Sequence, residues 1–162
     1  MKTIKLILLL LPFVTLSQSQ LSINIYQDAR LATFGDNKGN EAFTSNFRIR
    51  NEWQAGQLNH SYWFVAPEFE YADLQLAYKR YSVNVGQRFN KFSKLFQASY
   101  SLGYGITDRS HAKYTSFNAD AELSVVISSN IHLLLSSQLT QRKELQQFVM
   151  YSGFIGVKYN FN

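Results

Sequence analysis

Two carboxylates stand two residues apart at Glu68 and Glu70, and two arginines repeat that spacing at Arg48 and Arg50. In a β-strand, residues two apart point to the same face, so each pair would present two like charges to one side of a sheet. Paired carboxylates can act as general acid and base, whereas arginines opposite them would form ion pairs. The strand register therefore decides between a catalytic and a structural role.

The register depends on where the two connecting turns are centred. A turn centred on Asn59 brings the arginines of one strand opposite the carboxylates of the next, and a turn centred on Gln75 adds a further arginine. Because every carboxylate then faces a guanidinium, we predict an interior salt-bridge network and no catalytic carboxylate. The predicted pairs are Arg50 with Glu68, Arg48 with Glu70, and Arg80 with Glu70.

One other neighbourhood has residue types suited to catalysis. His111 lies in a polar segment with Asp108, Ser110 and Ser116. A nucleophile and its base must come within hydrogen-bond reach, and no deacylase or palmitoyltransferase motif surrounds these residues. No metal-ligand spacing or nucleotide motif is present. We expect no catalytic residue, no metal and no cofactor.

The first twenty residues have the composition of an export signal. Lys2 and Lys5 flank the start of an apolar run, Leu6–Leu11, and the small residues Ser17 and Ser19 follow. The run is shorter than the roughly 20 residues that a membrane-spanning helix needs. We therefore predict a cleaved signal peptide over 1–20 and a single mature domain over 21–162.

The charge of the mature chain is modest. Removal of the two signal lysines lowers the formal net charge from +5 to +3. Lysine and arginine are scattered without a basic patch, so we expect no nucleic-acid partner. The chain has no cysteine, which excludes disulfides and a lipoprotein signal.

The mature chain consists of segments in which apolar and polar residues alternate. Tyr and Phe are abundant (10 and 13) and Pro is scarce (2), which favours sheet. Each segment is long enough to cross a bilayer as a tilted strand. The eight predicted strands are 21–34, 42–54, 61–72, 78–89, 95–106, 116–127, 131–142 and 151–162. Their connections alternate between long polar loops (34–42, 73–77, 107–115, 143–147) and tighter turns (55–60, 90–94, 128–130).

Aromatic residues on the apolar face gather near the strand ends. Amphipathic rings favour the two water–lipid interfaces of a bilayer, so this pattern predicts an apolar face toward lipid and a polar interior. The girdle at the tight turns comprises Trp53, Trp63, Phe89, Phe96, Tyr159 and Phe161. The girdle at the long loops comprises Phe43, Tyr71, Tyr81, Tyr104, Phe117 and Tyr151.

The last strand carries a family resemblance. Its ending, "KYNFN" (158–162), resembles the C-terminal strand of outer-membrane β-barrels, in which the barrel-assembly machinery reads a terminal aromatic. Phe161 is penultimate here, whereas the family has Phe at the last position. With the export signal, eight strands and alternating loops, the chain resembles small eight-stranded barrels of the OmpA and OmpX type. The resemblance implies an all-β, antiparallel, up-and-down transmembrane barrel in the outer membrane of a Gram-negative bacterium.

The resemblance also guides the expected function. An eight-stranded barrel is just wide enough for side chains to fill it, so we expect no open pore. The leading hypothesis is a monomeric barrel with a structural or interaction role, in envelope integrity or adhesion, whose partners are outer-membrane lipid and the assembly machinery. Two alternatives remain: an outer-membrane lipid-modifying enzyme, and a soluble exported binder of lipocalin type.

Overall fold

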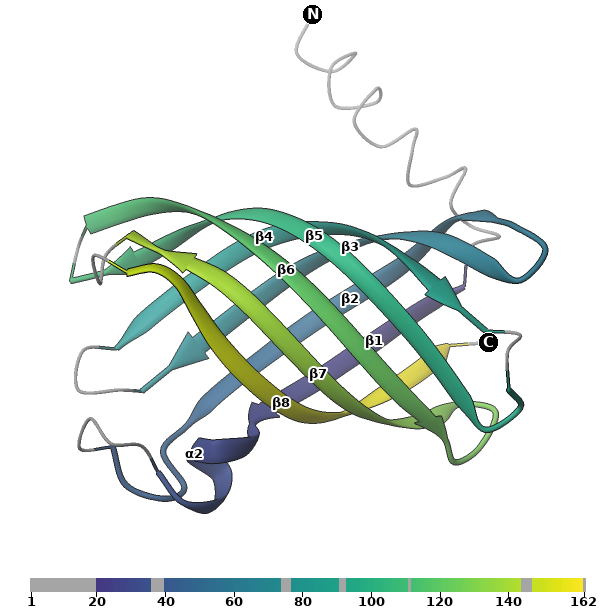
Figure 1. The fold of residues 1–162 in the computed structure, drawn as a ribbon, viewed down its shortest axis with the longest axis horizontal. Coiled ribbons are helices and arrows are strands. Elements are labelled where there is room, and N and C mark those ends of the chain that lie inside the picture. Colours follow the sequence, from purple (N-terminus) through teal and green to yellow (C-terminus); the bar gives the residue numbers. More distant parts are fainter. Residues whose placement is uncertain are drawn as a thin grey trace, which may run out of the picture.

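Eight antiparallel strands pair in chain order and close on themselves, with β1 bonded to both β2 and β8 in the computed structural model (Figure 1). The predicted up-and-down barrel is therefore confirmed. The structure describes residues 20–35, 40–73, 77–90, 93–110, 112–143 and 147–161, so all but the last residue of the predicted signal peptide lies outside it. The strands are β1 Leu21–Asp28, β2 Asn46–Gln57, β3 Ser61–Ala72, β4 Tyr78–Phe89, β5 Phe96–Arg109, β6 Ala112–Val126, β7 Ile131–Arg142 and β8 Gln147–Phe161.

The stagger of the strands is set by their register. Cross-strand pairing can be followed once around the barrel from Leu21 to Tyr151 on β8, and the β1–β8 register extended to that level corresponds to residue 31, an offset of ten residues. A stagger of this size tilts the strands by roughly 40° from the barrel axis. The intermediate positions are Trp53, Val65, Val85, Leu102, Ala119, Leu139 and Tyr151.

The first strand is shorter than predicted. We expected it to span 21–34, but β1 ends at Asp28 and the short helix α2, Ala29–Thr33, follows. The Asp28 carboxylate accepts a hydrogen bond from the Leu31 amide at 3.0 Å and so caps the helix. Leu31, expected to face lipid, is instead buried.

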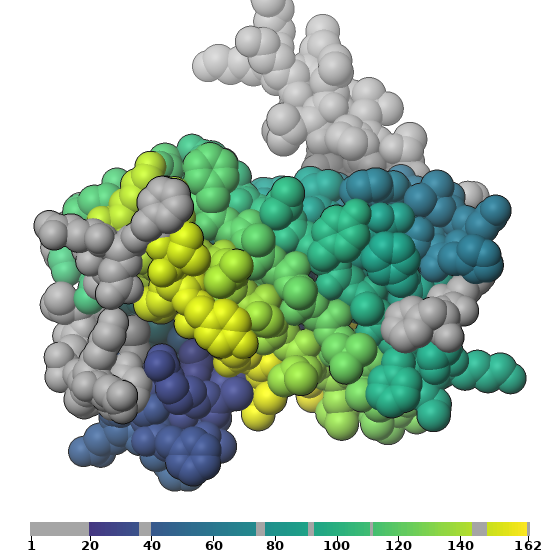
Figure 2. All heavy atoms as spheres, viewed as in Figure 1, coloured from purple at the N-terminus to yellow at the C-terminus, as the bar shows by residue number. Residues whose placement is uncertain are grey.

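Helix α2 takes the place that the outer end of β1 would fill. It contacts β1 and β8, and its purple side chains adjoin the yellow side chains of β8 in Figure 2. A helix packed against a strand edge is one way in which proteins protect unpaired backbone groups. In the described ranges no helix is long and apolar enough to cross a bilayer.

The second strand also begins later than predicted, and this changes the position of Phe43. β2 begins at Asn46, so Phe43 is not on a strand. Its amide donates to the Leu31 carbonyl at 2.8 Å, and its φ is +68°. The chain before β2 is thus bonded to α2, and Phe43 is not part of the strand-borne outer girdle.

The predicted long loop 107–115 is mostly strand. β5 continues to Arg109 and β6 begins at Ala112, with Asp108 opposite Lys113. The sequence shows no alternation here because a strand beyond the hydrocarbon layer can be polar on both faces. His111 lies outside the described residues.

Outside and inside are inverted relative to a soluble barrel. Large apolar side chains are exposed on every strand except β2, where the outward-facing ones are partly exposed, while charged and polar side chains are buried in the lumen. This arrangement fits lipid outside and is the reverse of the lipocalin-type alternative. The predicted girdle residues on strands face outward, at the inner level Trp53, Trp63, Phe89, Phe96, Tyr159 and Phe161, and at the outer level Tyr71, Tyr81, Tyr104, Phe117 and Tyr151.

Val83 tests the outward face. It lies at the middle of β4, opposite Pro67 and Tyr104, and is 53% exposed. Val83→Arg should lower the free energy of unfolding by about 2–4 kcal/mol, because a guanidinium would enter the hydrocarbon. Urea titration of the protein refolded into lipid vesicles measures this, with Val83→Leu as control. Equal stability of the two variants would contradict the lipid-facing assignment.

Gly86 allows an aromatic ring to enter the lumen. Phe64 is fully buried there, and a Cβ at Gly86 would lie 2.5 Å from its ring and 2.3 Å from the Tyr100 carbonyl oxygen. The position therefore needs a residue without a side chain. Gly153 offers a contrast, because a Cβ there would have no neighbour within 4 Å.

These two glycines make a matched pair of variants. Gly86→Ala should destabilise the barrel by about 1–3 kcal/mol through overpacking. Gly153→Ala should change stability by less than about 1 kcal/mol, since the methyl group meets open space. The same vesicle refolding titration separates them, and a larger loss at Gly153 would refute the packing assigned to Phe64.

Candidate functional site

The lumen contains equal numbers of opposite charges among the described residues. Six buried cations and six buried anions, none more than 4% exposed, point into it. Buried charges are tolerated when they are paired and hydrogen-bonded. The cations are Arg48, Arg50, Arg80, Arg88, Arg142 and Lys158, and the anions are Asp28, Glu52, Glu68, Glu70, Asp120 and Glu122.

Glu68 is the centre of the charge cluster that lies toward the long-loop end of the lumen. Arg50 donates to Glu68 at 2.7 Å, Arg80 approaches it at 3.4 Å, and the Arg48 guanidinium lies 3.6 Å away. Asp120 on β6 completes the group, since it accepts from Arg48 and lies 3.1 Å from Arg50. Three guanidinium groups thus share two carboxylates.

The predicted register matches the structure, but the predicted partners match only partly. Arg50 lies opposite Glu68, and both Arg48 and Arg80 lie opposite Glu70. However, Arg48 forms its ion pairs with Glu68 and Asp120. Register fixes the Cα positions, whereas a long arginine side chain reaches along and across the lumen to other carboxylates.

Glu70 is therefore less central than we expected. Its carboxylate lies 3.5 Å from Arg80 and accepts a hydrogen bond from the Tyr78 hydroxyl. The Arg142 guanidinium stacks 3.9 Å from the centre of the Tyr78 ring, an arrangement typical of cation–π contacts.

A second cluster lies toward the tight-turn end and was absent from the predicted network. Arg88 donates to both oxygens of Glu52, at 3.0 and 2.8 Å, and to Glu122 at 2.7 Å. Lys158 and the Tyr62 hydroxyl also donate to Glu52, at 2.9 and 3.0 Å. These residues occupy inward positions of their strands, so alternation alone could have identified them as members of the lumen.

Tyr26 joins the two clusters. The Arg48 guanidinium lies 4.2 Å from its ring centre, and its hydroxyl donates to Glu122. Tyr26 also packs with Leu134 and Phe154 in a small apolar core inside the lumen. Leu134, which interrupts the polar face of β7, is thus explained by this core.

The network ties opposite walls together. Arg48 and Arg50 reach from β2 to Asp120 on β6, and Arg48 also donates to Ser136 on β7 at 2.8 Å. Glu68 and Glu70 are likewise held in ion pairs, with Arg50 and Arg80, rather than presented to a substrate.

The structure separates two members of the neighbourhood around His111. Ser116 is fully buried and accepts a hydrogen bond from Arg80 at 2.7 Å inside the lumen. Asp108 lies eight residues earlier, on the outward face of β5, where it helps to line a depression at the rim. The barrel wall therefore stands between these two side chains.

Comparison with known proteins places the fold. No protein-family model matches the chain, and no curated protein matches it. Among solved structures, the Yersinia pestis outer-membrane protein Ail in a phospholipid nanodisc superposes with a TM-score of 0.60 at 17% identity, covering 89% of this chain and all of that one. The chain therefore shares its fold with small outer-membrane β-barrels.

Two further solved structures extend the comparison. The N-terminal barrel domain of Pseudomonas aeruginosa OprF matches with a TM-score of 0.56 at 12% identity, over 89% of this chain and all of that domain. The outer-membrane enzyme PagL matches with a TM-score of 0.53 at 9% identity, over 86% and 98%. These likenesses support the predicted eight-stranded architecture and the outer-membrane setting, and at such identities the shared feature is the fold.

Glu68 is the position at which the network can be tested most directly. Glu68→Gln should destabilise the barrel by about 3–5 kcal/mol, because buried guanidinium groups lose their shared carboxylate. Glu70→Gln, matched in chemistry, should have a smaller effect, since Glu70 has one arginine partner at 3.5 Å. Vesicle refolding titrations compare the two.

A double-mutant cycle supplies the control. Arg50→Gln in the Glu68→Gln background should recover part of the loss, since it removes the guanidinium that donates to Glu68 at 2.7 Å. Strictly additive effects, or a larger loss at Glu70, would contradict the central position of Glu68.

Proposed function

We propose that this protein is a non-catalytic, plugged barrel with a structural or interaction role in the outer membrane, in envelope integrity or adhesion. The observation that carries the proposal is the lumen, in which six buried cations balance six buried anions and ion pairs tie opposite strands together. Such an interior suits a rigid support for segments at the cell surface. The proposed partners are outer-membrane lipid and, during biogenesis, the barrel-assembly machinery, with the protein acting as a monomer.

The neighbours illustrate the range of roles that this fold can carry. Ail bears the name attachment invasion locus protein, which is compatible with an adhesive role for such a barrel. PagL is an enzyme, so the fold itself permits catalysis. In this chain the separation of Asp108 from Ser116 by the wall, and the engagement of Glu68 and Glu70 in ion pairs, favour the non-catalytic role.

Two measurements on one deletion strain, and one on the purified protein, test the proposal. Loss of the gene should leave the lipid A mass spectrum unchanged and should increase sensitivity to detergents or reduce attachment to surfaces. Purified protein in planar bilayers should show no stable conductance. A new lipid A species in the deletion strain would favour the enzyme, and a steady conductance would contradict the plugged lumen.

A further inference from the structure

A row of charged side chains runs around the outward face of the barrel beyond the outer girdle. Lys79 on β4 lies opposite Asp108 on β5, and Asp108 lies opposite Lys113 on β6. The Lys143 ammonium, just after β7, donates to the Thr115 hydroxyl at 3.2 Å. All three lysines are exposed, so three ammonium groups and one carboxylate form a continuous outward-facing row.

The row lies at the level of lipid headgroups. Two residues nearer the middle of β4, Tyr81 follows Lys79 on the same face, and on β6 Phe117 follows Thr115 in the same way. These rings belong to the outer girdle, which marks the boundary of the hydrocarbon. Side chains one step beyond that boundary meet headgroups rather than acyl chains.

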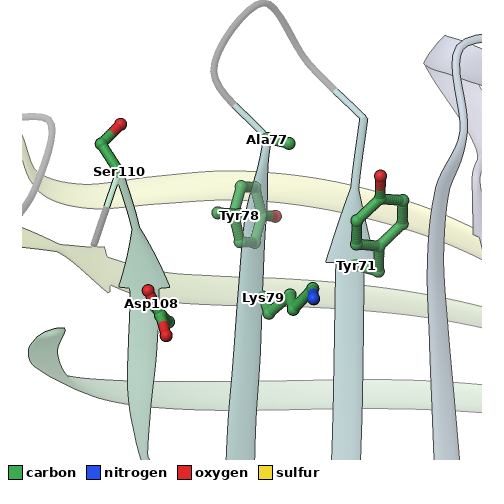
Figure 3. A pocket seen from close by; sticks show the side chains of 6 residues that line it. All are labelled: Tyr71, Ala77, Tyr78, Lys79, Asp108 and Ser110. Atoms are coloured by element: carbon green, nitrogen blue, oxygen red, sulfur yellow. The ribbon is translucent and has the colours of Figure 1, made fainter. Parts of the chain in front are cut away.

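A depression of about 270 Å³ opens at the Lys79 end of the row. Its lining residues are Tyr71, Ala77, Tyr78, Lys79, Asp108 and Ser110 (Figure 3). In this view the Lys79 ammonium extends toward Tyr71, and the Ser110 hydroxyl stands at the rim. The Lys79 ammonium supplies a charged donor for a phosphate oxygen, and the lining of the depression adds the hydroxyl groups of Tyr71, Tyr78 and Ser110.

We propose that this row binds the phosphate groups of an outer-leaflet lipid, with one phosphate seated in the depression beside Lys79. The inference rests on the proposed outer-membrane location and deepens it by naming the headgroup site. Lys79 and Lys113 are two strands apart, about 10 Å, so a lipid with two phosphates can engage both. The Asp108 carboxylate lies between them and weakens the attraction for phosphate. The row still has a net positive charge, because it contains three ammonium groups and one carboxylate.

The test is a titration of detergent-solubilised full-length mature protein with lipid A carrying two phosphates, with bound lipid counted by native mass spectrometry. Lys79→Gln and Lys113→Gln should each raise the Kd about fivefold, the effect of one cation at a charged lipid surface. Asp108→Asn should lower the Kd several-fold. Lys94→Gln, at an exposed lysine beside the opposite-end turn, is the matched control and should leave the Kd unchanged.

Two further ligands identify the source of the phosphate. Dephosphorylated lipid A should bind at least tenfold more weakly, and millimolar inorganic phosphate should compete only weakly. Equal binding of the dephosphorylated lipid, saturation by micromolar inorganic phosphate, or the same Kd for Lys79→Gln and Lys94→Gln would each overturn the proposal.

The outcome is separable from that of the proposed function. Heat-dependent gel mobility of each variant reports whether the barrel is folded, so a folded variant with unchanged binding refutes the headgroup site alone. A lipid A species altered by the wild-type protein would instead refute the non-catalytic role and leave the measured binding constants as they stand.

Discussion

Neutralisation of charge inside a narrow tube is the constraint on which the other features of this protein depend. A charged side chain moved from water to a lumen bounded by hydrocarbon loses its hydration, and only a partner nearby compensates for that loss. Here the partners come from different strands: Arg48 and Arg50 from β2, Glu68 from β3 and Asp120 from β6. Pairing across the lumen therefore requires the barrel to be closed, and closure in turn holds the pairs in place.

The same constraint explains the less regular residues of the lumen. Tyr26 supplies both a ring for the Arg48 guanidinium and a hydroxyl for Glu122, so it spans the gap between the two charge clusters. Phe154 presents its ring to the Arg48 guanidinium at 4.4 Å, and the glycine at position 86 leaves room for the buried ring of Phe64. Apolar rings and ion pairs are thus packed as one interior.

Alternation and turn positions in the sequence were enough to predict the closed barrel, its eight strands and the pairing of Arg50 with Glu68. Features that depend on neighbours distant in sequence could not be predicted in this way. The contact of Arg48 with Asp120 spans the lumen. The end of β1 was missed for a different reason: the cap that Asp28 forms with Leu31 is local, but it does not interrupt the alternation of apolar and polar residues. Residues 107–115 were predicted to be a loop because their sequence does not alternate. A strand with water on both sides needs no apolar face, so the ends of β5 and β6 lack this pattern.

The short first strand has a consequence for how the ring is joined. β1 contributes 8 residues to the line along which the two ends of the chain meet, whereas β5 and β6 run side by side over 14 and 15 residues. The two lines on either side of β1 are therefore the shortest ladders of the barrel, and helix α2 follows β1 in place of further strand. The barrel wall should therefore separate most easily beside β1, and during insertion the pairing of β1 with β8, which closes the ring, must form last.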